Sequence, residues 1–182
     1  MPRLFVAARL PASLLPTLQE ASDALAADAF RASPVRPELL HLTLRFIGEV
    51  GEARAEELRA WFLTLAAPKA AECAVALEKY GFFPSRDGLI LWAGLACGSG
   101  LPAFRNRVNE GLAGLGLADD GQAFIPHVTL ARRARLRTPF DALAQGLPLD
   151  KGMRPVPAFA LFDSAPGPDG PHYRALAEIT PG

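Results

Sequence analysis

Two short segments of the chain repeat a pattern of residue types that suits acid–base chemistry. Residues 41–44 read His-Leu-Thr-Leu, residues 127–130 read His-Val-Thr-Leu, and the chain contains three histidines in all. Both segments lie in apolar runs bounded by turn residues, so each is expected to form a strand. Alternate side chains of a strand point to the same face. Each segment therefore places an imidazole beside a hydroxyl, with its apolar residues pointing into a core.

Two histidines that face each other can act as a general acid and a general base. Imidazole titrates near neutrality, so one ring can be neutral while the other is protonated. The two threonine hydroxyls can hold an anionic oxygen, which suits a tetrahedral phosphate between the rings. This scheme needs no cofactor, no metal and no nucleophilic side chain. A metal site is the weaker alternative, because neither histidine has Asp, Glu or Cys at ligand spacing.

Composition limits the classes of protein and partner. At 182 residues the chain is expected to form one large domain or two small lobes, and its charged fraction of 21% is ordinary for a globular protein. The formal net charge is zero, which argues against wrapping long nucleic acid but not against binding a short nucleotide end. Cys73 and Cys97 lie in apolar runs and are expected to be buried hydrophobic residues without a disulfide.

The N-terminal residues show no signal-peptide pattern, and no apolar run reaches transmembrane length. We therefore expect a cytoplasmic protein with no membrane partner.

Hydrophobic periodicity predicts a mixture of helices and strands. Helices are expected from Pro11 until Ser33–Pro37 ends the first one, at Glu52–Ala67 and at Leu101–Leu115, with a helical turn at Asp141–Gln145. Strands are expected at Leu4–Leu10, Leu39–Ile47, Glu72–Phe83, Leu89–Leu95, Ala123–Ala131, Arg154–Asp163 and Tyr173–Ile179. The main turns and loops are expected at Gly48–Gly51, Pro84–Gly88, Asp119–Gly121 and Ser164–Pro171.

The hairpin connections favour an α+β fold over a doubly wound parallel sheet. A strand, a helix and a histidine-containing strand follow one another in both halves of the chain. This order predicts two similar lobes whose histidine motifs face each other across a cleft. Because no low-complexity linker separates the halves, residues 1–182 are expected to form a single bilobal domain.

Several blocks of sequence resemble one known family. They are LFVAARLP at 4–11, HLTLRFIGEV at 41–50, ILWAGL at 90–95 and PHVTLAR at 126–132. Over essentially the whole chain they resemble the RNA 2′,3′-cyclic phosphodiesterases, also called 2′-5′ RNA ligases, of the two-histidine phosphoesterase superfamily. The order and separation of the two histidine motifs form the specific part of this resemblance. The opening strand and the LFDS segment at 161–164 support it more weakly.

The resemblance implies a bilobal α+β fold with pseudo-symmetric lobes of mainly antiparallel sheet, helices on the outside and the active-site cleft between the lobes. It also implies metal-independent hydrolysis of a 2′,3′-cyclic phosphate to a 2′-phosphomonoester. By the family's assignment, His41 is the proton donor and His127 the proton acceptor. Thr43 and Thr129 would bind the non-bridging phosphate oxygens, and Arg132 matches the family's basic residue after the second motif. The implied substrates are RNA ends or small cyclic nucleotides, and the protein is expected to be a monomer.

Other residues near the motifs have less specific interpretations. Arg133, Arg135 and Arg137 are interpreted as a solvated face that could steer an RNA end toward the cleft. Strict alternation places Phe46 in the core unless a bulge turns it. His172 lacks the motif and is interpreted as a loop residue. Three further aromatic residues could stack on a base but are expected to pack in the core: Trp92, Phe82 and Phe83.

Several functions stay open on sequence grounds. Because the two motifs are nearly equivalent, their chemistry alone does not decide which histidine is the acid. The same pair run in reverse would join a cyclic-phosphate end to a 5′-hydroxyl, so hydrolysis and ligation are not distinguished. The neutral net charge also leaves open a phosphodiesterase for a small nucleotide, such as ADP-ribose cyclic phosphate. A non-catalytic RNA-binding module is a further alternative, and the two intact motifs argue against it.

Overall fold

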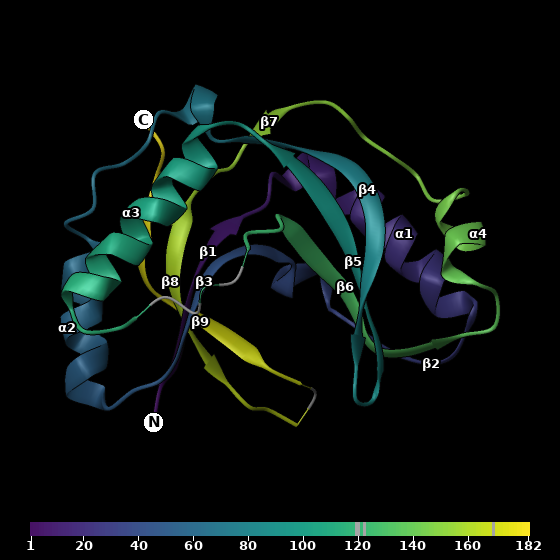
Figure 1. Ribbon diagram of the computed structural model, residues 1–182, viewed down its shortest axis with the longest axis horizontal. Coiled ribbons are helices and arrows are strands. Elements are labelled where there is room, and N and C mark those ends of the chain that lie inside the picture. Colours follow the sequence, from purple (N-terminus) through teal and green to yellow (C-terminus); the bar gives the residue numbers. More distant parts are fainter. Residues whose placement is uncertain (119–120, 122, 169) are drawn as a thin grey trace.

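The computed structural model describes residues 1–118, 121, 123–168 and 170–182. Two sheets dominate it, and every pairing between described strands is antiparallel (Figure 1). The first sheet has the order β3-β1-β8-β9 and the second β2-β6-β5-β4-β7. The strands are β1 (Arg3–Arg9), β2 (Ala29–Pro34), β3 (His41–Glu49), β4 (Ala74–Ser85), β5 (Gly88–Cys97), β6 (His127–Leu136), β7 (Arg154–Pro155), β8 (Phe159–Ala165) and β9 (His172–Ile179).

The predicted fold, with two lobes of antiparallel sheet and outer helices, is confirmed. The lobes are not the two halves of the chain, however. Strands β8 and β9 from the C-terminal end complete the first sheet, whereas β2 from the N-terminal half pairs with β6 in the second. The chain changes sheets after β7, which pairs with β4, while β8 pairs with β1. The single strand predicted at Arg154–Asp163 is therefore wrong, because Pro155 and Pro157 lack the N–H groups that a continuous ladder requires.

In the described part of the chain, four α-helices cover the sheets: α1 (Leu15–Ala27), α2 (Glu52–Phe62), α3 (Gly100–Gly114) and α4 (Phe140–Ala144). Helix α1 packs on β2 and β6, and α3 packs on β3 and β5. Helix α2 ends five residues earlier than predicted, because the Thr64 hydroxyl and the Thr64 N–H both donate to the Trp61 carbonyl. No described helix is long and apolar enough to cross a lipid bilayer.

Two strand boundaries differ from the prediction near the second motif. Strand β6 begins at His127 and continues to Leu136, whereas the predicted strand ended at Ala131. Its extension pairs with β2, whose sequence, AFRASP, has no regular apolar alternation. The first helix was expected to continue to Ser33–Pro37, and this bound is wrong because the helix ends at Ala27 and a strand follows. Of the predicted loop at Asp119–Gly121, Asp119 and Asp120 lie outside the described residues. Gly121 has a positive φ of 68°, which is typical of a turn.

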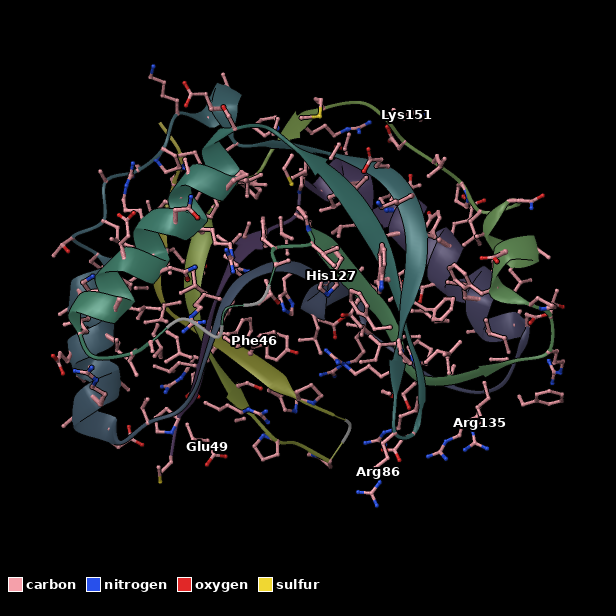
Figure 2. The ribbon with its side chains drawn as sticks, in the orientation of Figure 1. Phe46, Glu49, Arg86, His127, Arg135 and Lys151 are labelled. Atoms are coloured by element: carbon pink, nitrogen blue, oxygen red, sulfur yellow. The ribbon has the colours of Figure 1, made fainter. Side chains whose placement is uncertain are left out.

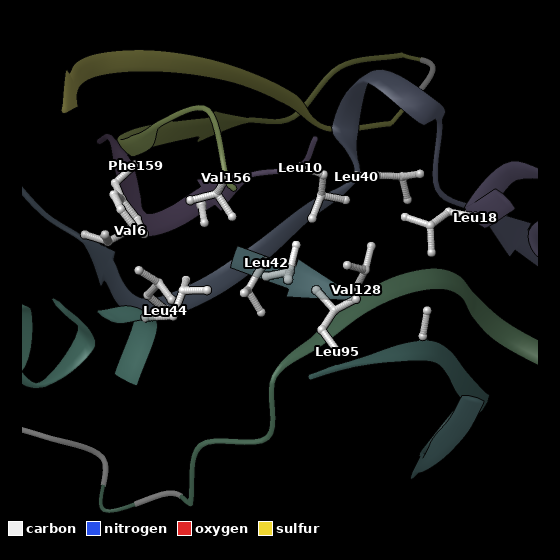
Figure 3. Packing of buried hydrophobic residues seen from close by; sticks show 14 of the residues in the cluster. Val6, Leu10, Leu18, Leu40, Leu42, Leu44, Leu95, Val128, Val156 and Phe159 are labelled. Carbon is white, nitrogen blue, oxygen red and sulfur yellow. The ribbon is translucent and has the colours of Figure 1, made fainter. Parts of the chain in front are cut away.

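The apolar residues of the two histidine motifs belong to one continuous core. Leu42 of β3 and Val128 of β6 are both fully buried in it, and Figure 3 shows them in the same packed layer. A smaller apolar cluster lies on the opposite face of the first sheet and contains Phe5, Ala7, Ala160 and Phe162. The sheet is therefore apolar on both faces, and the smaller cluster lies on the face that carries His41.

Leu42→Ala is expected to lower the free energy of unfolding by about 2–5 kcal/mol, because it leaves a cavity in the shared core. Chemical denaturation of the wild type and the variant measures this difference. Leu63→Ala is the matched control: Leu63 is 51% exposed, so its truncation should cost less than about 0.5 kcal/mol. Equal losses in the two variants would contradict the assignment of Leu42 to the core.

Candidate active site

Each histidine strand contains a bulge at the same position of its motif. In β3, Thr43 pairs with Ala7 and Arg45 with Val6, so Leu44 has no partner in the ladder. In β6, Thr129 pairs with Trp92 and Ala131 with Leu91, so Leu130 has none. An extra residue shifts the alternation of side chains by one position. The third residue after each threonine therefore returns to the face that carries the histidine.

Neighbouring groups satisfy the carbonyl of each bulged residue. The Leu44 carbonyl accepts a hydrogen bond from Nε of Arg105, on α3, at 3.1 Å. The Leu130 carbonyl accepts one from the backbone N–H of Val35 at 2.7 Å and a longer one, of 3.4 Å, from the Ser22 hydroxyl. Because an unpaired buried carbonyl costs free energy, these contacts stabilise the two bulges.

The bulge in β3 overturns the prediction for Phe46. Its side chain is 63% exposed rather than buried, and Figure 2 shows Phe46 and His127 in the region between the two sheets. Among the other aromatic residues, Trp92 is buried as predicted, with 8% exposure. The core prediction is wrong for Phe82, which is 41% exposed and packs on Phe140, and for half-buried Phe83, which contacts His127.

Both imidazoles are held in the same way by their own strands. Nδ1 of His41 lies 2.6 Å from the Leu39 carbonyl oxygen, and Nδ1 of His127 lies 2.7 Å from the Ile125 carbonyl oxygen. A carbonyl only accepts hydrogen bonds, so Nδ1 must carry the proton in each ring. This fixes the tautomer and leaves Nε2 as the nitrogen that can gain or lose a proton.

Aromatic rings pack against both imidazoles and restrict their orientation. The His41 ring centroid lies 5.0 Å from that of Phe5 and 5.2 Å from that of Tyr173. The His127 centroid lies 5.2 Å from that of Phe83 in an edge-on arrangement. The two imidazoles thus resemble each other in hydrogen bonding and in ring packing, although the aromatic rings that contact them come from different strands.

A cleft of about 250 Å³ contains all five residues predicted for the site: His41, Thr43, His127, Thr129 and Arg132. Its other described lining residues are Val35, Leu39, Phe46, Phe83, Ile90 and Tyr173. His172 is not among them and is exposed, but its interpretation as a loop residue is wrong, because it is the first residue of β9 and pairs with Ala165 of β8. The tertiary structure therefore brings the two motifs to one cleft with one guanidinium.

Sequence reasoning missed Tyr173 as a residue of the cleft. Burial raises the pKa of the Tyr173 phenol above its ordinary value, so the group is a neutral hydrogen-bond donor and acceptor at physiological pH. It lies at the start of β9, far from both motifs in sequence, and β9 is not adjacent to either histidine strand. Sequence spacing gives no signal for such a residue.

The environment disfavours the charged form of both histidines. Burial lowers the pKa of His41 and of His127, and the hydrogen bonds to Leu39 and Ile125 oppose this only in part. The positive charge of Arg132 lowers both pKa values further. In the free protein the two rings are therefore neutral at pH 7, and an anion in the cleft would favour their protonation.

We expect NMR titration of the free protein to give pKa values below 6.5 for both histidines, because burial and Arg132 oppose protonation. Inorganic phosphate should raise both values by placing negative charge in the cleft. A matched titration in chloride at the same ionic strength separates binding from screening. A pKa of 6.5 or more for either ring in the chloride sample would contradict this electrostatic description.

The three arginines after Arg132 are exposed on β6 and just beyond it. The Arg137 guanidinium lies 5.0 Å from the centroid of the Phe30 ring and donates to the Ala27 carbonyl at 3.1 Å. This part of the chain thus presents a basic surface, as predicted. Among the described residues, no group of three or more His, Cys, Asp or Glu side chains is arranged to hold a metal ion.

Comparison with known proteins identifies the family. The sequence pattern of the 2′-5′ RNA ligase superfamily matches residues 10–160, which is most of the chain. The chain belongs to this superfamily. The resemblance predicted from its sequence blocks is therefore confirmed.

Curated relatives and solved structures agree with this membership. An RNA 2′,3′-cyclic phosphodiesterase of Aeropyrum pernix is 33% identical over 163 residues, which cover 86% of this chain and 90% of the relative. One from Thermus thermophilus is 32% identical over 186 residues, covering 98% and 89%. A crystal structure of a Thermus thermophilus protein superimposes with a TM-score of 0.78 at 30% identity, covering 98% of this chain and 97% of that one. E. coli LigT, solved with 3′-AMP, shares the fold with a TM-score of 0.75 at 24% identity, covering 100% and 99%.

Proposed function

We propose that this member of the superfamily hydrolyses the 2′,3′-cyclic phosphate of RNA ends to a 2′-phosphomonoester, without a metal ion. The arrangement of the two histidines carries the proposal: each has Nδ1 fixed by a carbonyl, a threonine two residues on, and a place in the cleft that contains Arg132. The activity named for its curated relatives supports the choice of substrate.

In the proposed step, a water oxygen forms a bond to phosphorus while the bond from phosphorus to the 3′-oxygen breaks. The proton of the water passes to Nε2 of His127, and Nε2 of His41 gives its proton to the departing 3′-oxygen. The products are a 2′-phosphate and a free 3′-hydroxyl. The pair then holds its proton on the other ring, and exchange with solvent restores the starting state. We assign His41 as the acid because the resemblance to the family implies this role.

The hydroxyls of Thr43 and Thr129 are proposed to donate hydrogen bonds to the non-bridging phosphate oxygens, and Arg132 to stabilise their charge. Donors that are fixed beside oxygens on which negative charge develops lower the activation barrier most. The bound phosphodiester anion also offsets the effect of burial on the pKa of His41. Substrate binding thus supplies the protonated acid, which the free protein disfavours.

We further propose that residues 1–182 act as a single domain and as a monomer, because both motifs of the cleft come from one chain. The thiols of Cys73 and Cys97 are unpaired, which fits the reducing cytoplasm that we propose as the location of the protein.

The test is turnover of an oligoribonucleotide with a 2′,3′-cyclic phosphate end in the presence of EDTA, with the 2′- and 3′-phosphate products resolved. We expect a 2′-phosphate product and no loss of rate on chelation. A 3′-phosphate product would mean that the 2′-oxygen departs, and loss of activity in EDTA would contradict metal independence. Adding a 5′-hydroxyl oligonucleotide to the same assay reveals ligation as a longer product.

A matched assay on ADP-ribose cyclic phosphate separates the remaining functions. Turnover of this compound but not of the oligonucleotide would favour a small-nucleotide phosphodiesterase. RNA binding without turnover of either substrate would favour a non-catalytic module and overturn the proposal.

A further inference from the structure

A second cavity, of about 350 Å³, opens directly beside the catalytic cleft. The two share four lining residues: Val35, Leu39, Arg132 and Tyr173. The second cavity adds the guanidinium groups of Arg36 and Arg133 to that of Arg132, and none of its described lining residues is acidic. The second cavity is therefore strongly basic, and it adjoins the cleft in which the cyclic phosphate is proposed to react.

Arg133 reaches this cavity through an unusual backbone. Its φ is 54°, and it is the sole non-glycine residue of the described chain with a positive φ. Successive residues of a regular strand point to opposite faces, but here Arg132 and Arg133 are both exposed and line the same cavity. Backbone of this kind persists only where the surroundings hold it, and it is common at ligand sites.

The three guanidinium groups are not equally available. Arg36 donates to the Pro171 carbonyl at 3.0 Å and lies 3.4 Å from a Glu38 carboxylate oxygen. Arg132 and Arg133 form no ion pair with a residue of the described chain. Arg133 thus faces the cavity with its donors free for an anion, whereas Arg132 lies between the cavity and the cleft, where it is proposed to bind the cyclic phosphate. Arg is the residue type best suited to bidentate phosphate binding.

A third cavity, of about 390 Å³, also adjoins the cleft and shares His41, Phe46, Arg132 and Tyr173 with it. Phe5 and Arg3 also line it, so this cavity combines three aromatic rings with two arginines. A nucleoside carries a stacking base and a 5′-oxygen on different parts of its ribose. The cavity with Phe5 and Phe46 offers rings on which a base can stack, and the cavity with Arg36 and Arg133 suits a charged group attached to the 5′-oxygen.

We propose that the cavity of Arg36, Arg132 and Arg133 binds a phosphate group on the 5′-oxygen of the terminal nucleoside. In an RNA chain this group is the phosphodiester that precedes the cyclic end, so the cavity selects RNA ends over mononucleotides. The proposal rests on the proposed function for the placement of the cyclic phosphate. The same chemistry is available from a 5′-phosphate of a small nucleotide, and the test distinguishes these two sources.

The test measures binding of product analogues, which does not depend on turnover. The probes are adenosine 2′-monophosphate, adenosine 2′,5′-bisphosphate and the dinucleotide ApA with a 2′-phosphate at its 3′-terminal residue. Isothermal titration calorimetry gives the Kd of each. We expect the dinucleotide to bind about 10- to 100-fold more tightly than the monophosphate, which corresponds to a hydrogen-bonded charge pair. An equal gain for the bisphosphate would mean that the phosphate alone suffices, and a smaller gain would assign the preference to the RNA chain.

Two variants of matched charge locate the effect. Arg133→Asn removes the guanidinium and keeps a residue type that tolerates a positive φ. Arg135→Asn removes the same charge two residues along β6, outside the cavity lining, where Figure 2 shows the side chain at the outer edge of the molecule. We expect the ratio of the monophosphate Kd to the dinucleotide Kd to fall to near one in Arg133→Asn and to persist in Arg135→Asn.

A ratio near one in the wild type, or equal losses in the two variants, would overturn the proposed phosphate site. The assay on cyclic-ended RNA is a separate readout. Failure of turnover with an Arg133-dependent gain in binding would overturn the proposed function and retain the phosphate site. Turnover without an Arg133-dependent gain in binding would retain the proposed function and overturn the phosphate site.

Discussion

Replacing His127 with alanine is expected to lower kcat for a cyclic-ended oligoribonucleotide about 10²–10⁴-fold, and His41→Ala should do the same. Each variant removes one partner of the proposed acid–base pair, whose Nε2 atoms are the free nitrogens of two rings fixed through Nδ1. Single-turnover kinetics with resolved 2′-phosphate product measures the loss. Because the two rings serve one step, the double variant should be little slower than either single one.

His172→Ala is the matched control for both variants. It removes the third histidine of the chain, which is exposed and outside the described lining of the cleft, so kcat should stay within twofold of wild type. Near-normal kcat in His127→Ala or His41→Ala would exclude the two-histidine step. An equal loss in all three variants would point to a general effect on folding instead.

Arg132→Gln is expected to lower kcat/KM about 10²–10³-fold, the usual effect of losing one fixed donor to a developing anion. The same change should shift the pH profile. Arg132 lowers the pKa of both histidines, so its removal raises both values. The bell-shaped profile of kcat/KM, which reports the acid and the base of the free enzyme, should therefore move to higher pH.

The profile of kcat/KM against pH, measured between pH 4 and pH 9 at constant ionic strength, tests both parts of this prediction. Arg135→Gln provides the control, because it removes an equal charge from the same strand outside the cleft. A loss of rate without a shift in pH would show that Arg132 contacts the substrate but does not affect the histidines. A shift to lower pH would contradict the described electrostatics.

Local pattern was informative where one strand holds all the relevant groups. The spacing of His41 and Thr43, and of His127 and Thr129, depends only on the period of two along a strand, so the sequence predicted that each pair shares a face. The buried alternation of Leu42 and Val128 follows from the same rule. The residue types then indicated the chemistry, because an imidazole pair with hydroxyls has few uses besides proton transfer around an anion.

The rule of alternating side chains failed at Phe46, further along the same strand. Strict alternation predicted a buried Phe46, but the bulge at Leu44 returns this ring to the cleft. Whether a strand bulges depends on what can satisfy the extra carbonyl, and here the donor is Arg105 of α3, 61 residues away in sequence. Such a partner is chosen by packing, and no local propensity encodes it.

The sequence by itself determined the two histidine–threonine pairs, the α+β class and the family. The tertiary structure decided how the pairs meet. It joined the N-terminal and C-terminal strands in one sheet and brought Tyr173 to the cleft from β9. It also placed Arg132 and Arg133 in the lining of one basic cavity. These outcomes depend on contacts between residues far apart in the chain. Their free energies come from burial and hydrogen bonding in three dimensions, which the order of residues along a strand does not reveal.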